Sequence, residues 1–482
     1  MEDWPDLKLT PSTSDPETDH QGENDDYTSA RGSVMTSFKR SYLAAASAIA
    51  LSLSACAPEA AKPEEPAAPA APAAPVAADP AVSSLELAAD PATLGFDAAA
   101  FAKAKADIEA GIAAGKIPGG LFLVAKGGKV VNITAVGTEG PGDPDPVTPE
   151  TIFRIYSMSK PIVSVATMQL VEDGKIALDD NISKYIPEFA NPKVLVGNGV
   201  TRPATREITV RDLLSHKSGL IYGIFDPESE LGKLYMAAGD TRTDFTDLDL
   251  AKALAALPLR FDPGSAWHYS RSTDVLGAVI EVASGKTLDV LLDEQIFKPL
   301  GMDDTHFYLE EDEFKRLAEP PTTIAPLSTP MVKAPMFSGG GGLNSTTEDY
   351  FRFTEMLRGK GTYRGVEIIK PETLDAMLVD EIATGVDRKA WFYDALPGSG
   401  FGLGFGLIPI NPADPAAGRY FTWSGYAGTN MWVDPVNDIT TIFMMQNNEA
   451  SPDFRPLHGQ WVYGGYKPAS TSGPAAPAAP AQ

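Results

Sequence analysis

Two residues whose chemistry could be combined stand three positions apart. Ser157 and Lys160 form a Ser-x-x-Lys pair, and Lys160 is the only charged residue between Ile155 and Val171. In a helix this spacing places both side chains on one face. A buried lysine has a lowered pKa, and a helix N-terminus favours a developing negative oxygen on the serine. The pattern indicates an activated nucleophile, although on the motif alone a capping serine with a surface lysine explains it equally well.

A tyrosine that could handle protons follows about a hundred residues later. Tyr269 lies in the segment DPGSAWHYS (262–270), on a loop before a helix expected to begin near Asp274. A phenol beside a buried lysine can pass a proton between a nucleophile and a leaving group. Taken alone, a core aromatic residue beside Trp267 is the more ordinary interpretation of Tyr269. His268 is interpreted as a packing residue.

A third segment of interest is Trp423-Ser424-Gly425-Tyr426, near the end of the chain. Its small residues at a strand edge would let a substrate approach the backbone closely. A backbone N–H there could complete an oxyanion hole with the N–H of Ser157. In isolation, an ordinary strand with a tolerated glycine explains the segment equally well.

Strand patterns, which could position these segments, occur at both ends of the chain. Residues 121–136 read as two strands joined by Gly127-Gly128, which is a strong hairpin signal. Residues 420–421 and 430–446 also read as strands, with a turn at 435–438. The segment 398–406 (GSGFGLGFG) lacks the pattern of a nucleotide-binding loop and is interpreted as a glycine-rich strand that lines a cleft.

The middle of the chain is mostly helical in pattern. Helices are predicted over 163–172, 249–257, 274–283 (closed by Gly285), 288–297 and 347–357, the last with a capping box at 345–348. We therefore expect an α/β (α+β) fold, with an antiparallel sheet formed from both chain ends, flanked by helices, and an inserted mostly helical domain. Within a catalytic region at 83–467, residues 83–180 and about 365–467 form the sheet domain and about 181–364 the helical domain. The active site is expected in the crevice between them.

Composition excludes several classes of function. The 482 residues include 64 acidic and 39 basic side chains, for a formal charge of −25, so electrostatic attraction to nucleic acid is not expected. One cysteine cannot form an intramolecular disulfide. The five histidines show no spacing typical of a zinc site. We predict neither a metal nor another cofactor.

The chain ends predict export. Residues 35–56 combine a basic start, a short apolar run and the sequence Leu53-Ser54-Ala55-Cys56, and they resemble a bacterial lipoprotein signal peptide. Residues 1–34 have a disordered composition, which suggests translation from Met35. Residues 57–82 form an Ala/Pro linker, and 468–482 form a similar tail. We expect a lipoprotein anchored through Cys56 that faces the periplasm from the outer membrane.

The three chemical motifs jointly resemble a known group of enzymes. Ser157-x-x-Lys160, Tyr269-Ser270 and Trp423-Ser424-Gly425 have the order and approximate spacing found in serine β-lactamases and penicillin-binding proteins. Three connecting segments look like those of the β-lactamase-related esterases, the family VIII carboxylesterases: LLSHKSGL (213–220), FDPG (261–264) and GGGGL (339–343). The resemblance covers about residues 95–465.

The resemblance implies a role for each motif residue. It implies Ser157 as the acylated nucleophile, with Lys160 and Tyr269 as the proton-handling pair. The backbone N–H groups of Ser157 and Tyr426 would form the oxyanion hole. Substrate contacts are implied for Tyr156, Trp423, Ser424, Gly425 and Arg271.

Two departures from the β-lactamase pattern affect the expected substrate. Trp423 stands where β-lactamases place a lysine that holds the substrate carboxylate, so a contact of ~1.5–3 kcal/mol is missing. Arg271 stands where class C β-lactamases have an asparagine, and it could restore a cation if it faces the cleft. Neutral esters should therefore suit this chain better than anionic β-lactams.

The resulting hypothesis is a serine hydrolase that cleaves small carboxylic esters through an acyl-enzyme, with no obligate protein partner. The alternatives are a β-lactamase or D-Ala-D-Ala carboxypeptidase and, in another class, a non-catalytic envelope lipoprotein that binds peptidoglycan or a protein. The chain has no Gly-x-Ser-x-Gly, which excludes the nucleophile elbow of an α/β-hydrolase. His216 is interpreted as a structural histidine at a turn.

Overall fold

A computed structural model describes residues 85–467 except 89, 243, 326, 329, 332, 383–398 and 412–413. The acidic segment 1–34, the predicted signal peptide with Cys56, the linker 57–82 and the tail 468–482 lie outside the described residues. All described residues belong to one compact unit, Pro72–Gln482. The predicted boundaries between sheet and helical domains therefore stay predictions.

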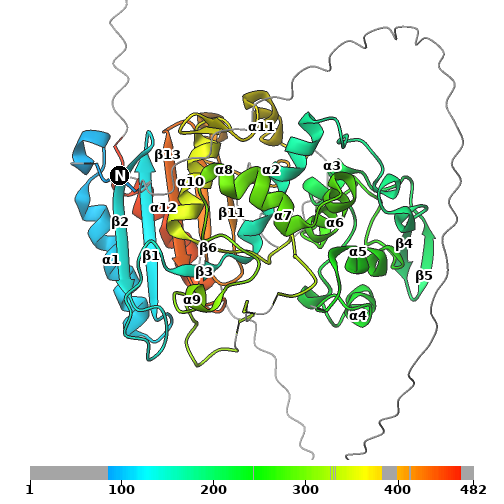
Figure 1. Ribbon diagram of the computed structural model, residues 1–482, viewed down its shortest axis with the longest axis horizontal. Helices are drawn as coiled ribbons and strands as arrows, with labels where there is room; N and C mark the ends of the chain where they lie inside the picture. The colour runs from blue at the N-terminus through cyan, green and yellow to red at the C-terminus, as the bar shows by residue number, and fades with distance from the viewer. Residues whose placement is uncertain are drawn as a thin grey trace, which may run out of the picture. The chain divides into compact units, whose positions relative to one another are not determined.

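A seven-stranded antiparallel sheet is the largest sheet among the described residues, and it joins early and late segments of the described chain (Figure 1). An early and a late strand, β1 (Gly119–Lys126) and β13 (Ile439–Met445), pair within this sheet, with Phe122 opposite Phe443. This confirms the predicted sheet. In spatial order the strands are β2 (Lys129–Gly137), β1 (Gly119–Lys126), β13 (Ile439–Met445), β12 (Asn430–Asp434), β11 (Arg419–Ser424), β10 (Gly406–Pro409) and β9 (Gly400–Phe401).

The hairpin between β1 and β2 turns at Gly127 and Gly128. Their φ values are 59° and 80°, in the left-handed region that glycine adopts without the clash of a Cβ. Two successive residues in this region match the twist of the flanking strands. The predicted hairpin is therefore confirmed.

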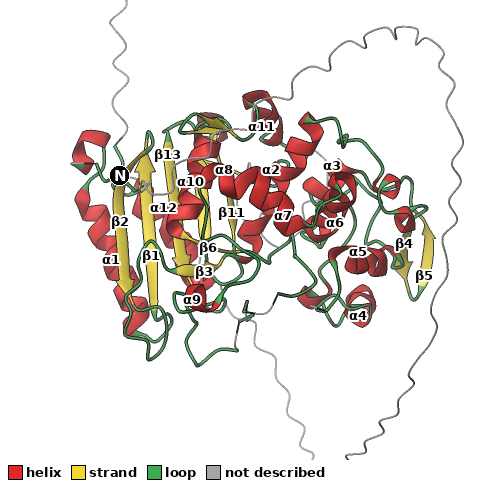
Figure 2. Ribbon diagram, viewed as in Figure 1, coloured by secondary structure: helices red, strands yellow, loops and turns green. Residues whose placement is uncertain are grey.

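Helices cover both faces of the sheet (Figure 2). Phe122 and Val124 pack in one core with residues of α1 (Ala98–Ala113) and α12 (Ser451–Tyr463). Leu121 and Leu123, which alternate with them along β1, belong to the core shared with α2 (Ser159–Glu172) and α10 (Thr347–Arg358). This alternation is the period-2 pattern of a strand buried on both sides.

The segment between β3 (Ile152–Arg154) and α10 is mainly helical and agrees with the predicted helices to within a few residues. The predicted helix at 288–297 continues as a π-helical turn over Asp293–Phe297. The helices are α3 (Val210–Leu214), α4 (Glu230–Ala237), α5 (Asp247–Ala255), α6 (Ser272–Ser284), α7 (Leu288–Leu292), α8 (Lys298–Leu300), α9 (Glu311–Phe314) and, after α10, α11 (Pro371–Met377). The 3-10 turns are Pro91–Leu94, η2 (Tyr156–Met158), Ile182–Lys184, Pro187–Phe189, η5 (Gly223–Phe225) and Pro415–Ala417. The short strand pairs are β3 (Ile152–Arg154) with β6 (Asn344–Thr346), β4 (Lys193–Gly197) with β5 (Val200–Pro203), and β7 (Thr362–Tyr363) with β8 (Val366–Glu367).

The capping box predicted at 345–348 is wrong by one residue. Thr346 is the N-cap of α10, and its side chain accepts from the backbone N–H of Asp349. Strand β6 continues through Thr346, which pairs with Ile152 in the β3–β6 ladder, so the helix begins one residue later than predicted. Among the described residues, no helix is both long enough and apolar enough to cross a bilayer.

Candidate active site

Ser157 lies on a tight turn that leads from β3 through η2 into α2. Tyr156 has a φ of 43°, in the left-handed region that a bulky side chain seldom adopts. Ser159 holds this turn, because its hydroxyl donates to the carbonyl oxygen of Tyr156 (2.6 Å) and accepts from the N–H of Leu343 (3.1 Å). Backbone strain of this kind occurs at functional sites. The turn places Ser157 at the head of α2, where the Ser-x-x-Lys spacing predicts it.

The structure brings the three predicted reactive groups together. The Oη atom of Tyr269 lies 2.5 Å from the Oγ atom of Ser157, and the Nζ atom of Lys160 lies 3.3 Å from the same Oγ. The Nζ of Lys160 also lies 4.6 Å from the centre of the Tyr269 ring. Both distances to Ser157 are short enough for proton transfer in a reacting complex. This arrangement can deprotonate a serine hydroxyl and reprotonate a leaving group.

Lys160 is buried, with 1% of its surface exposed. Its Nζ atom donates to the carbonyl oxygen of Gly340 (2.5 Å) and to the Oη of Tyr222 (3.0 Å). Burial lowers the pKa of Lys160 to about 7; the charge of Asp274 opposes this shift, and that of Arg271 adds to it. A large share of the lysine is therefore a neutral amine near neutral pH, which can act as a base.

Tyr269 lies in a buried aromatic cluster, defined here as Tyr222, Trp267, Tyr269, Ile382, Phe401 and Trp423. Burial raises the pKa of Tyr269, while hydrogen bonds with Ser157 and Trp423 oppose the rise. Tyr269 therefore keeps its proton at neutral pH.

The ring of His216 lies 5.0 Å from the Tyr269 ring, and its Nδ1 lies 3.3 Å from the Oγ of Ser270. Burial lowers the pKa of His216, so it is a neutral structural residue, as predicted.

The segment with Gly425 packs tightly against the Ser157 turn. A Cβ on Gly425 would lie 2.4 Å from the carbonyl oxygen of Ile155, so a side chain has no room there. The next residue, Tyr426, places its ring edge-on to Tyr156, with 5.6 Å between ring centres. Within the part of the chain that the structure describes, the backbone N–H groups of Ser157 and Tyr426 have no hydrogen-bond partner. Both are free to bind an oxyanion, which is their predicted role.

The other predicted substrate contacts lie beside this segment, and their roles stay predictions. Trp423 packs on Tyr269, with 5.5 Å between ring centres. The hydroxyl of Ser424 accepts from the side-chain amide of Asn430 at 2.5 Å. The single strand predicted at 398–406 is wrong over its described residues, because the chain turns between β9 and β10, where Gly404 has a φ of 92°. This turn comes close to α2, because a Cβ on Gly404 would lie 2.2 Å from the Oγ of Ser164.

The structure does not support the predicted substrate contact of Arg271, because two ion pairs hold its side chain in the protein interior. Its Nε atom lies 2.8 Å from Asp240 and its Nη1 lies 3.4 Å from Asp274, and both carboxylates are fully buried. The guanidinium also lies 4.7 Å from the ring centre of Tyr222. The Arg271 side chain is therefore part of the wall behind Lys160, and its charge is already balanced.

Tyr222 and Asp274 contact this site and were missed at the level of sequence. Tyr222 follows the LLSHKSGL segment by two residues, and Asp274 was interpreted only as a helix start. The one sequence feature that pointed to such residues was the lysine in an apolar run, because a buried lysine needs a hydrogen-bond acceptor and a nearby opposite charge.

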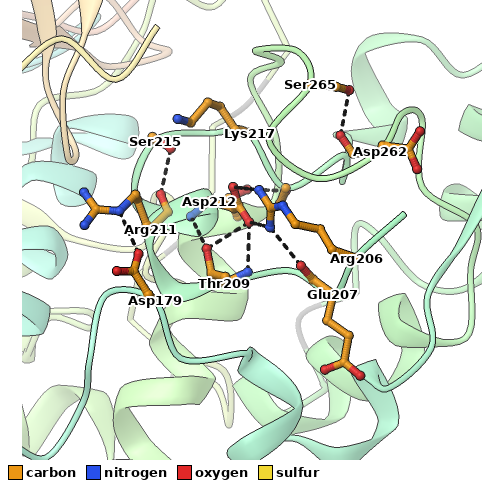
Figure 3. Close-up of polar contacts among 12 residues, drawn as sticks. Asp179, Arg206, Glu207, Thr209, Arg211, Asp212, Ser215, Lys217, Asp262 and Ser265 are labelled. Carbon is orange, nitrogen blue, oxygen red and sulfur yellow. Dashed lines mark hydrogen bonds and ion pairs between the residues drawn. The ribbon is translucent and has the colours of Figure 1, made fainter. Parts of the chain in front are cut away.

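The segment that leads to Tyr222 begins at α3, which is fixed by an ion pair between the exposed Arg206 and the buried Asp212 (Figure 3). Asp212 accepts two bonds from the guanidinium of Arg206, at 2.5 and 2.8 Å. It also accepts from the backbone N–H of Thr209, whose hydroxyl accepts in return from the N–H of Asp212. This capping box fixes the start of the loop that carries His216 and Tyr222.

Comparisons with known proteins agree with this geometry. The family model for beta-lactamases matches residues 104–461. Esterase EstB of Burkholderia gladioli is 30% identical over 360 residues, which cover 68% of this chain and 86% of EstB. Lovastatin esterase of Penicillium rubens is 28% identical over 374 residues, which cover 70% of this chain and 91% of that enzyme. Among solved structures, EstCE1, a hydrolase with promiscuous acyltransferase activity, is similar at a TM-score of 0.63 and 26% identity, over 76% of this chain and 98% of EstCE1.

Proposed function

The chain belongs to the beta-lactamase family, and we propose that it is a serine carboxylesterase that hydrolyses small neutral esters through an acyl-enzyme. The observation that carries this function is the position of the Ser157 Oγ between the Tyr269 Oη at 2.5 Å and the Lys160 Nζ at 3.3 Å. The esterases among its relatives support the same reaction.

The two pKa shifts assign the proton transfers. Because the pKa of Lys160 is lowered to about 7 and that of Tyr269 is raised, Lys160 is the group ready to accept a proton at neutral pH. The Oγ of Ser157 bonds to the ester carbonyl carbon while its proton passes to Lys160. The N–H groups of Ser157 and Tyr426 hold the negative oxygen. The ester C–O bond then breaks, and the alcohol leaves with a proton supplied through Tyr269 and restored to it from Lys160.

Water completes the cycle through the same groups. It attacks the acyl carbon and gives its proton to the Lys160–Tyr269 pair, which returns one proton to Ser157 as the acid departs. One water is consumed, and the products are one alcohol and one acid. No other reactant is required.

The charges around the site favour neutral esters. Trp423 is buried against Tyr269, and the cation of Arg271 is paired with two carboxylates. An anionic β-lactam would therefore lack a charge-assisted contact of ~1.5–3 kcal/mol, which a neutral ester does not need.

Ester hydrolysis is tested by comparing two chromogenic substrates. We expect kcat/KM for p-nitrophenyl butyrate to exceed that for a chromogenic cephalosporin by about tenfold or more. Labelling with a fluorophosphonate should give an adduct on the peptide that carries Ser157, and none in Ser157→Ala. A preference for the cephalosporin would favour the β-lactamase alternative, and the absence of any adduct would favour the non-catalytic one.

We also propose that the protein is exported and anchored to the outer membrane through Cys56, facing the periplasm. The support is the order of basic, apolar and small residues that ends at this cysteine. In a Gram-negative host, the full chain should incorporate labelled palmitate and sediment with membranes. Cys56→Ser should lose both properties, whereas Ser47→Ala in the apolar run should keep them. Equal labelling of Cys56→Ser and the unmodified chain would contradict the anchor.

A further inference from the structure

Asp274 is a fully buried carboxylate on the first turn of α6, and it contacts both groups that hold the amine of Lys160. Its Oδ1 accepts from the N–H of Gly340 at 3.1 Å and from the hydroxyl of Ser338 at 2.5 Å. Its Oδ2 lies 3.4 Å from the Oη of Tyr222. Gly340 and Tyr222 are the acceptors of Lys160, so one carboxylate fixes both.

The Tyr222 hydroxyl has two acceptors within reach, Asp274 and Tyr269, and the charged carboxylate is the stronger one. A carboxylate only accepts, so the hydroxyl of Tyr222 donates to Asp274 and can only accept from Lys160. The carbonyl of Gly340 also only accepts. A neutral lysine amine has two N–H groups and one lone pair, and these two acceptors use both N–H groups. The lone pair is therefore left for the hydroxyl of Ser157, 3.3 Å away.

We infer that Asp274 is a positioning residue for the catalytic base: through Tyr222 and the Gly340 peptide, it turns the lone pair of Lys160 toward Ser157. This inference rests on the proposed ester hydrolysis, in which Lys160 accepts the serine proton. Position 340 has room only for glycine, because a Cβ there would lie 2.4 Å from the Oδ2 of Asp274. The close approach keeps the Gly340 carbonyl against the amine.

Because Asp274 is charged, its proposed role can be tested through the pH dependence of the reaction rate as well as through protein stability. Its charge raises the pKa of Lys160, whereas Arg271 lowers it. Loss of the Asp274 charge should therefore lower the pKa of Lys160, and the acidic limb of the pH–rate profile should move to lower pH. The titratable and charged groups around the lysine come from several elements: His216 after α3, Tyr222 before η5, Asp240 after α4, Tyr269 before α6, and Arg271 and Asp274 at the start of α6.

The test is Asp274→Asn, assayed with p-nitrophenyl butyrate across pH 5–9. The amide oxygen can keep the bonds to Gly340 and Ser338. Its NH₂ then faces Tyr222 and also the guanidinium of Arg271, which loses its acceptor at this position. Tyr222 must accept from this NH₂, so its own proton turns toward the lysine lone pair and competes with Ser157. We expect kcat to fall on the order of 10- to 100-fold, KM to change by less than about threefold, and the acidic limb to shift downward.

A second substitution tests the competing hydroxyl directly. Tyr222→Phe alone should lower kcat, because it removes an acceptor of Lys160. In the Asp274→Asn background, the same change should raise kcat, because it removes the competing donor. This reversal of sign is not expected of a residue that only stabilises the fold. The matched control is Asp247→Asn, which changes a buried carboxylate that binds the N–H of Phe337 and contacts neither Lys160 nor Tyr222. It should keep the wild-type kcat and profile.

The outcomes separate this inference from the proposed function. A wild-type protein inert toward the ester would reject the function itself. An active wild type with an unchanged kcat and pH limb in Asp274→Asn would overturn the positioning role, as would an equal loss in Asp247→Asn. If Asp274→Asn does not fold, Tyr222→Phe decides: a lower kcat supports the role, and a wild-type kcat overturns it.

Discussion

Replacing Tyr269 by phenylalanine is expected to lower kcat/KM for p-nitrophenyl butyrate by about 10²–10⁴-fold. The substitution removes one oxygen, the Oη that lies 2.5 Å from the Oγ of Ser157. The ring can remain in the aromatic cluster, packed on Trp423 and His216. The loss should therefore appear mainly in kcat, because the hydroxyl takes part in proton transfer in the transition state, whereas the substrate-binding surface is retained.

Tyr222→Phe is the matched control for this prediction. Tyr222 belongs to the same cluster, is similarly buried, and also contacts Lys160, at 3.0 Å. Its hydroxyl contacts Lys160 and Asp274 and has no bond to Ser157. We expect its loss to cost less than about tenfold in kcat/KM. Steady-state kinetics on both variants, with near-UV circular dichroism to check packing, would distinguish the two roles. Equal losses would show that Tyr269 acts only through the cluster.

The predictions made from sequence succeeded where a local pattern has one structural solution. Two adjacent glycines between alternating apolar residues specify a two-residue hairpin, and the φ values of Gly127 and Gly128 are those of such a turn. A serine and a lysine three apart in an apolar run place both groups at one helix end. The hypothesis that Tyr269 joins them depended on family resemblance, because 112 residues separate it from Ser157.

The predictions failed where several partners compete for one side chain. Arg271 stands next to a motif residue, and an arginine there could face either the cleft or the protein interior. The outcome was decided by Asp240, which is 31 residues away and fully buried. Similarly, Ser345 and Thr346 are both good caps, and Ser345 was excluded because Thr346 is still extended and pairs with Ile152, which is far away in sequence. Contacts of this kind have no local signature.

Replacing Lys160 by methionine is expected to lower kcat/KM by about 10²–10⁴-fold, because the amine that accepts the serine proton is removed and the apolar stem is kept. In the unmodified enzyme, kcat/KM should rise with pH and level off above about pH 7, where the lysine is neutral. The residual kcat/KM of Lys160→Met should lack this rise with pH. A variant that retained both its rate and a limb near pH 7 would contradict the assignment of the base.

The same substitution has a stability signature whose sign follows from proton binding. Burial lowers the pKa of Lys160 to about 7, from 10.5 for the free side chain. Between these values the unfolded chain binds a proton that the folded chain does not, so the free energy of unfolding rises with pH, by up to about 1.4 kcal/mol per unit. Below about pH 7 both states are protonated, and the folded state carries the full cost of a buried ammonium. The methionine variant lacks this dependence. Its free energy of unfolding relative to the unmodified protein, measured with urea at pH 6, 8 and 10, should therefore be highest at pH 6 and fall toward pH 10. Parallel curves for the two proteins would mean that Lys160 stays charged in the folded state, and Tyr269 would then have to supply the base.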